Sequence, residues 1–156
     1  MPTPARHVAV GVIEVQAAII ARNTELLRRR AMGQLELERS AYLTLRALAH
    51  DGPADINTLA ARLGLDASTV GRQVTGLAGD GLVERTPSAD DRRRSIVAIR
   101  GDGRDRLAIT EALRRERTTE LLDDWSIADL EQFGDYLRRY NAAVASAYMT
   151  GLAPSD

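Results

Sequence analysis

The stretch from residue 55 to residue 99 constrains the fold most, because two short helix patterns, joined by a tight turn, precede a hairpin pattern. Apolar residues recur at three- and four-residue intervals from Ile56 to Leu63, which predicts an amphipathic helix. Asp55 is placed to cap the N-terminus of that helix, and Gly64 is placed to end it in the left-handed conformation. This spacing is typical of a helix-turn-helix.

The second helix of the pair is predicted to have one apolar and one polar face. Leu65 is expected to return to the core, and Asp66 to act as the N-cap. The apolar face consists of Val70, Val74 and Leu77. Hydroxyl, guanidinium and amide side chains occupy the other face, namely Ser68, Thr69, Arg72, Gln73 and Thr75. Such groups can reach phosphates and base edges in a DNA major groove, which predicts a DNA-reading face. The alternative interpretation is an ordinary exposed helix face.

Two glycines interrupt this second helix pattern. Gly71 and Gly76 each cost about 1 kcal/mol of helix stability relative to alanine. Glycine at such positions is useful where a helix backbone must come close to DNA. The glycines therefore favour the DNA-binding interpretation of the polar face.

A hairpin with an arginine-rich tip follows the helix pair. Strands are predicted at residues 82–85 and 95–100, with turn-forming residues at 87–90. The tip between them carries Asp91, Arg92, Arg93 and Arg94. Arginines on a loop beside a reading helix suit the narrow, electronegative minor groove. The alternative is a solvated turn whose charge is balanced locally by Asp90 and Asp91.

Together these features resemble the winged helix-turn-helix of the MarR family of bacterial transcription regulators. The matching residues are Leu59-Ala60, Leu63-Gly64-Leu65, Ser68-Thr69-Val70, Arg72, Leu77, Gly81-Leu82-Val83-Glu84-Arg85, Asp91-Arg92-Arg93, Val97, Ile99 and Gly103. The resemblance implies that Arg93 enters the minor groove and that Asp91 braces it by a charge-assisted pair. The chain departs from the family at Arg100, where a threonine or serine cap is usual, so we expect Asp102 to cap the next helix.

Apolar stripes predict further helices on both sides of the central stretch, at about residues 8–30, 35–50, 102–124 and 127–149. The last helix has a local start signal, because Ser126 and Asp129 have the spacing of a capping box. Trp125 and Leu130 would then form a hydrophobic staple. The apolar surface of the first helix is expected to be shared between its own domain and a second subunit.

The predicted fold is mainly α with a small β wing, a winged helix-turn-helix with N- and C-terminal dimerisation helices. The DNA-binding lobe is expected at residues 35–100, and the helical dimerisation region at residues 7–30 and 102–150. A chain of 156 residues, 44% of them hydrophobic, is long enough for one good core, so these regions form one compact chain.

Composition excludes several classes of function. All 21 basic residues are arginine and cysteine is absent, which rules out lysine Schiff bases, P-loop lysines and thiolate metal sites. His7 and His50 lack acidic neighbours at metal-ligand spacing, so we expect no metal site. Without cysteine, lysine or a plausible histidine-based triad, we also expect no cofactor and no enzyme activity. The net charge of −1 means that DNA affinity must come from local clusters, such as the six arginines against two aspartates over residues 92–106.

The predicted function is sequence-specific transcriptional regulation by a homodimer, a repressor that binds double-stranded DNA at a pseudo-palindromic operator. The resemblance implies control by a small phenolic or lipophilic effector. Tyr42, Arg46, His50 and Trp125 are candidates to line its pocket, although packing roles explain them more simply. The alternative is a winged-helix protein-interaction module without specific DNA binding. Without a signal-peptide pattern or an apolar run of about 20 residues, a cytoplasmic protein with no membrane partner is expected.

Overall fold

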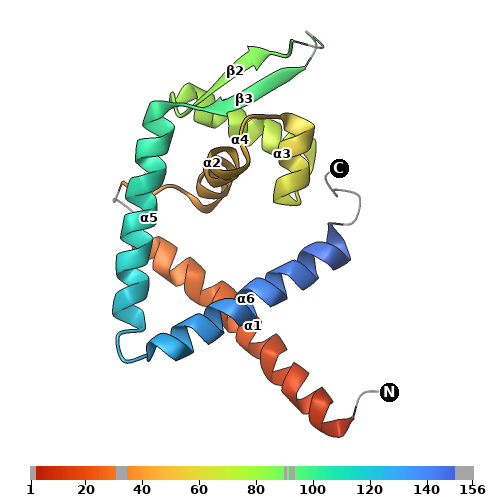
Figure 1. Cartoon of the computed structure of the whole chain (residues 1–156), viewed down its shortest axis with the longest axis vertical. Coiled ribbons are helices and arrows are strands. Elements are labelled where there is room, and N and C mark those ends of the chain that lie inside the picture. Colours follow the sequence, from red (N-terminus) through yellow and green to blue (C-terminus); the bar gives the residue numbers. More distant parts are fainter. Residues whose placement is uncertain (1–2, 31–34, 90, 92–93, 150–156) are drawn as a thin grey trace. The chain divides into compact units, whose positions relative to one another are not determined.

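The computed structural model describes residues 3–30, 35–89, 91 and 94–149, and it is mainly helical with a small antiparallel sheet, as predicted (Figure 1). The elements in chain order are α1 (Pro4–Arg30), α2 (Arg39–Asp51), β1 (Ala54–Asp55), α3 (Ile56–Leu63), α4 (Ala67–Gly79), β2 (Val83–Pro87), β3 (Ser95–Ile99), α5 (Gly101–Leu121) and α6 (Ile127–Tyr148). The chain divides into two compact units, residues 1–34 and 35–156, and each is described separately.

The first unit consists of the single long helix α1. None of the residues of α1 is buried, and Val8, Val12 and Ile13 are among the exposed apolar ones. The Glu25 carboxylate accepts hydrogen bonds from Arg28 and Arg29, which lowers its pKa to about 2. α1 also contains an 18-residue window with a mean hydropathy of 1.3, and by length and composition it could cross a membrane. A single helix that passes by length and composition is weak evidence of a membrane span, so the expectation of no membrane partner stays a prediction.

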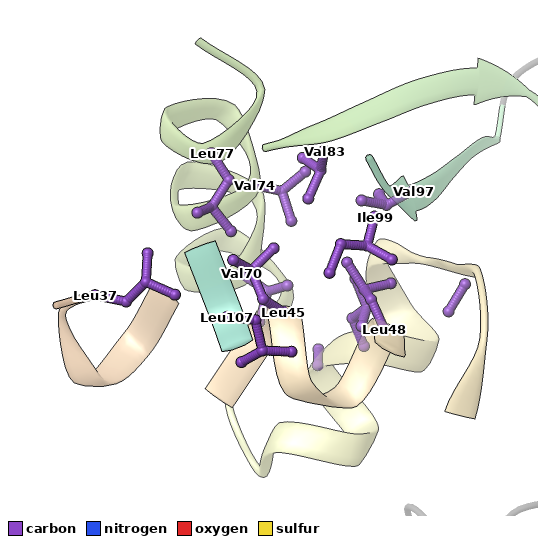
Figure 2. Close-up of a cluster of buried hydrophobic side chains, with 13 residues drawn as sticks. Leu37, Leu45, Leu48, Val70, Val74, Leu77, Val83, Val97, Ile99 and Leu107 are labelled. Atoms are coloured by element: carbon purple, nitrogen blue, oxygen red, sulfur yellow. The ribbon is translucent and has the colours of Figure 1, made fainter. Parts of the chain in front are cut away.

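The second unit is built around a core where α2, α3 and α4 meet the inner face of the sheet (Figure 2). Its largest fully buried apolar side chains are Leu45, Leu48, Leu59, Val70, Val74, Val83 and Val97. Leu37 and Leu107 extend the core from outside the helix pair. The predicted apolar face of α4 is confirmed, because Val70, Val74 and Leu77 are all buried.

Leu65 does not enter this core, contrary to the prediction, since 41% of it is exposed. Its N–H donates to the Ala60 carbonyl and the next residue, Asp66, caps α4. Leu65 is therefore held in the turn between the two helices, where its side chain stays at the surface. The left-handed conformation of Gly64 is confirmed, with φ of 64°.

The sheet has the strand order β1-β3-β2, and both pairings are antiparallel. β3 alternates along its length, with Val97 and Ile99 buried in the core. The sequence did not predict β1, because a strand of two residues has no periodic pattern. Its pairing places Asp55 opposite Ile96, so the start of α3 lies against the central strand.

The segment before α2 is not helical, although a helix from residue 35 was predicted. Hydrogen bonds with α5 hold this segment instead. The Leu37 N–H donates to Thr110 Oγ1 over 3.0 Å, and the Glu36 carboxylate accepts hydrogen bonds from Arg114 and Arg117. Because these partners lie more than 70 residues away, local periodicity gives no sign of them.

α5 begins at Gly101, with Arg100 in the N-cap position and without a side-chain cap. The prediction that Asp102 caps this helix is wrong. Asp102 lies in the first turn, where its negative charge still favours the positive end of the helix dipole. The predicted N-cap of α6 is confirmed, because Ser126 Oγ accepts from the Asp129 N–H over 3.2 Å, which is the N-cap half of a capping box. The Asp129 carboxylate in turn accepts the Ser126 hydroxyl.

Gly103 marks the closest approach of α5 to the sheet. A Cβ atom at this position would lie 2.2 Å from the Leu82 carbonyl oxygen and 2.9 Å from Ile99 Cγ1. The same Leu82 carbonyl accepts the Arg100 N–H over 3.0 Å. Backbone packing of this kind requires glycine, so Gly103 fixes how α5 leaves the sheet.

We expect Gly103→Ala to lower the free energy of unfolding by about 1–3 kcal/mol, the usual effect of overpacking, even though alanine favours helix. Urea unfolding followed by circular dichroism measures the change. Gly101→Ala is the matched control, because a Cβ there meets no atom within 4 Å. Equal stability of the two variants would contradict the close-approach argument.

Candidate nucleic-acid interface

The turn between α3 and α4 is closed by Asp66. Its carboxylate accepts the Thr69 N–H over 2.8 Å, which is the predicted N-cap, and also accepts the hydroxyls of Ser68 and Thr69. These bonds, the Ser68 hydroxyl first, hold the pKa of Asp66 well below its ordinary range. Because both hydroxyl protons point to Asp66, the oxygens of Ser68 and Thr69 are left to act as acceptors.

Arg72 and Thr75 lie exposed on the outer face of α4. The Arg72 guanidinium donates to Thr69 Oγ1 over 3.2 Å, so a chain of hydrogen bonds runs from Asp66 through Thr69 to Arg72. Thr75 Oγ1 donates to the Gly71 carbonyl over 2.8 Å. The structure thus brings four of the five predicted polar residues of this helix to one surface.

Gln73 is placed differently. Its Oε1 accepts a hydrogen bond from Thr44 Oγ1 over 3.3 Å, and Thr44 is fully buried on α2. Gln73 itself is half-buried. The structure therefore separates Gln73 from the outer face and gives it a contact between the helices α2 and α4, and its role toward DNA stays a prediction.

Arg85 was not singled out as a site residue from the sequence. It projects from β2 to α4, where its guanidinium donates to the Gly71 carbonyl and to Thr75 Oγ1, both over 3.2 Å. The alternation of the strand could have identified Arg85, because residues two apart lie on the same face and Val83 is buried. Arg85 stays exposed and reaches α4, the helix that covers this face of the strand.

Arg85 closes a groove at the surface of α4. The groove has a volume of about 470 Å³ and is lined by Ile56, Ser68, Gly71, Arg72, Thr75 and Arg85. Its walls come from α3, α4 and β2, and two of its six residues are cationic. Added Cβ atoms at Gly71 and Gly76 meet nothing within 4 Å, so neither glycine is required by packing inside the chain.

The wing is the hairpin of β2 and β3. Arg92 and Arg93 lie outside the described residues, so the predicted insertion of Arg93 and its bracing by Asp91 stay predictions. Asp91 is exposed and its carbonyl accepts the Arg94 N–H over 2.9 Å. The Arg94 guanidinium turns to the Asp55 carboxylate at the start of α3.

A second cavity, of about 620 Å³, lies between α2, α5 and the start of α6. Its lining is Tyr42, Arg46, Glu111, Arg114, Arg115, Thr118, Thr119, Leu122, Asp123, Trp125 and Leu130. The Arg114 guanidinium lies 4.1 Å from the centre of the Tyr42 ring, and Arg46 pairs with Glu111 over 3.2 Å. Trp125 packs edge-on against Phe133, with 5.4 Å between the ring centres. The cavity thus combines aromatic walls with cationic groups.

Within the described ranges, the structure contains no group of three or more histidine, cysteine, aspartate or glutamate side chains that could hold a metal ion. His50, one of the two histidines, contacts the adjacent Asp51 carboxylate with Nδ1 at 2.9 Å.

Comparison with known proteins places this geometry in a family. A MarR family model matches residues 35–94. The chain is 35% identical over 134 residues to the uncharacterized HTH-type transcriptional regulator YxaD of Bacillus subtilis, a match that covers 86% of this chain and 94% of that protein.

Solved structures show the same fold. A MarR family protein from Bacillus stearothermophilus superposes with a TM-score of 0.75 at 18% identity, covering 89% of this chain and 97% of that one. The PcaV transcriptional regulator of Streptomyces coelicolor, solved in complex with its natural ligand, gives a TM-score of 0.68 at 24% identity, with 83% and 91% covered. Both YxaD and PcaV are named as transcriptional regulators. This chain belongs to the MarR family, and it is a DNA-binding winged-helix transcriptional regulator.

Proposed function

We propose that this regulator is a repressor that binds a pseudo-palindromic operator as a homodimer. One α4 helix per subunit enters a major groove of double-stranded DNA, and the two wings grip the flanking minor grooves. The observation that carries the proposal is the groove along α4, which combines exposed hydrogen-bonding groups, two arginines and a helix backbone uncovered at Gly71. Arg93 at the wing tip enters the minor groove, and Asp91 braces it.

The dimer is proposed from the apolar surfaces of the terminal helices. α6 leaves aromatic and aliphatic side chains exposed, including Tyr136, Tyr140, Val144 and Tyr148. α1 exposes a row of valines and isoleucines on its own unit. Burial of such surfaces in a two-fold dimer provides the favourable free energy for association. We assign the apolar residues of α1 to this interface and not to a membrane, and we place the protein in the cytoplasm with the DNA that it binds.

The cavity between α2 and α5 is proposed as the site of a small phenolic or lipophilic effector. Tyr42, Trp125 and Leu122 provide an apolar surface, while Arg46 and Arg115 provide charge for an acidic group. A regulator of the same fold, PcaV, was solved with its natural ligand bound. Effector binding changes which distances between the two α4 helices of the dimer are most populated, and this lowers the affinity for the operator.

Arg72→Ala should weaken binding to the operator by about 5- to 150-fold, because one bidentate arginine contact contributes about 1–3 kcal/mol of discrimination. Fluorescence anisotropy on DNA from the upstream region of the gene, against scrambled DNA and over a salt series, measures the loss. Arg138→Ala is the control, since Arg138 lies exposed on α6 and pairs with Asp135 three residues away. The opposite outcome is that wild type and variant bind both DNAs equally weakly. If selection from genomic fragments then also yielded no preferred sequence, the protein-interaction module would be favoured.

Gly71→Ala should stabilise the free protein by up to about 1 kcal/mol, because the new Cβ meets no atom within 4 Å and alanine favours helix. The same variant should bind the operator several-fold more weakly, since the Cβ would stand between the α4 backbone and the DNA. Thermal unfolding and anisotropy together measure both effects. Improved stability with unchanged affinity would place the DNA away from Gly71.

Effector binding is measurable through Trp125, the single tryptophan of the chain. Titration with phenolic compounds, starting with 4-hydroxybenzoate, should change its emission, and Thr118→Leu should reduce the response by filling the cavity. Thr24→Leu is the matched control, because Thr24, like Thr118, is exposed and donates its hydroxyl to the carbonyl four residues earlier. A response that Thr118→Leu leaves unchanged would place the effector elsewhere.

A further inference from the structure

We propose that Arg94 is a positioning residue of the wing, which acts through its ion pair with Asp55 and does not contact DNA. Asp55 is the N-cap of α3, and Arg94 lies at the outer end of the wing strands, 39 residues further along the chain. The pair therefore connects the helix-turn-helix to the wing. Its effect on operator binding rests on the proposed function, whereas its effect on the wing does not.

Asp55 uses its two carboxylate oxygens for two different elements. Oδ1 accepts the Thr58 N–H over 2.8 Å and caps α3. Oδ2 accepts the Arg94 guanidinium. The side chain of Asp55 is only 9% exposed. A carboxylate that is this well shielded needs a charge partner, so Arg94 is required where it lies.

Arg94 is also the residue at which the regular hairpin ends. Its carbonyl accepts the Ser88 N–H over 2.8 Å, and its N–H donates to the Asp91 carbonyl over 2.9 Å. Strand pairing lies on one side of this residue and the tip of the wing on the other. A side chain anchored at this point fixes the direction in which the tip leaves the sheet.

Among the residues that the structure describes, little else holds this end of the wing to α3. β1 contributes two residues, Ala54 and Asp55, and its pairing with β3 extends only to Ile96. Beyond that point, β3 pairs only with β2, up to the contact of Ser95 with Pro87. A two-stranded hairpin of this length is free to twist unless an additional contact restrains it. The pair of Asp55 with Arg94 is such a contact, and it lies just beyond the last β1 pairing.

Charge gives a way to separate a positioning role from a DNA contact. If Arg94 bound a phosphate, Asp55 would compete with the DNA for its guanidinium, and Asp55→Asn would strengthen binding. If Arg94 positions the wing, Asp55→Asn should weaken binding as much as Arg94→Ala does. Asparagine caps a helix as well as aspartate, so Asp55→Asn removes the charge and leaves the α3 cap in place.

The test is a double-mutant cycle with Asp55→Asn, Arg94→Ala and the double variant, in the full chain. We expect each single variant to lose about 5- to 10-fold in operator affinity, and the double variant to lose no more than either, because both remove the same contact. A gain of affinity in Asp55→Asn, or additive losses, would overturn the proposal. The matched control is the exposed pair of Asp135 with Arg138 on α6, where the same substitutions should leave affinity unchanged in variants that sedimentation shows to be dimers like the wild type.

Hydrogen exchange in the free protein tests the pair without DNA. The Ser88 and Arg94 amides should exchange several-fold faster in either single variant, with no further increase in the double variant, while core amides such as that of Val70 stay protected. Unchanged exchange at both amides would overturn the positioning role. If wild type fails to select any operator but the wing amides respond as expected, the proposed function fails and the positioning role stands.

Discussion

The packing of α4 against α2 and the inner face of the sheet is the constraint on which the DNA-binding surface depends. Val70 and Val74 are fully buried at one side of α4. Because successive residues of a helix are separated by 100°, this burial turns Ser68, Arg72 and Thr75 to the opposite side. The apolar residues that stabilise the fold therefore also select which polar residues face outward.

The outward surface is ordered before any DNA arrives. Asp66 holds the hydroxyl of Thr69, and Thr69 in turn accepts from Arg72. Arg85 reaches across from β2 to Thr75. Side chains that are already held in place lose less conformational entropy on binding, so a contact made by Arg72 retains more of its favourable free energy. The helix, its cap and the neighbouring strand thus act together at one surface.

The helix α2 connects the two functional regions that we propose. Its inner residues Thr44 and Leu45 contact the core and α4, whereas Tyr42 and Arg46 line the cavity beside α5. A ligand that moves Tyr42 would therefore act on the helix that supports α4. Coupling through one rigid, packed element requires no separate pathway between effector and DNA.

Features that depend on near neighbours along the chain could be predicted from the sequence. Asp55, Asp66 and Gly64 were identified as helix ends, since each bonds to backbone groups within about four residues. The wing and the outer face of α4 followed from periodicity in the same way. Contacts between distant residues could not be read, because no local pattern encodes them: Arg94 turns to Asp55, Gln73 to Thr44, and Arg85 to α4. Chain order and periodicity thus settled which elements form and which faces they present, while packing of those elements decided the partner of each charged or polar side chain.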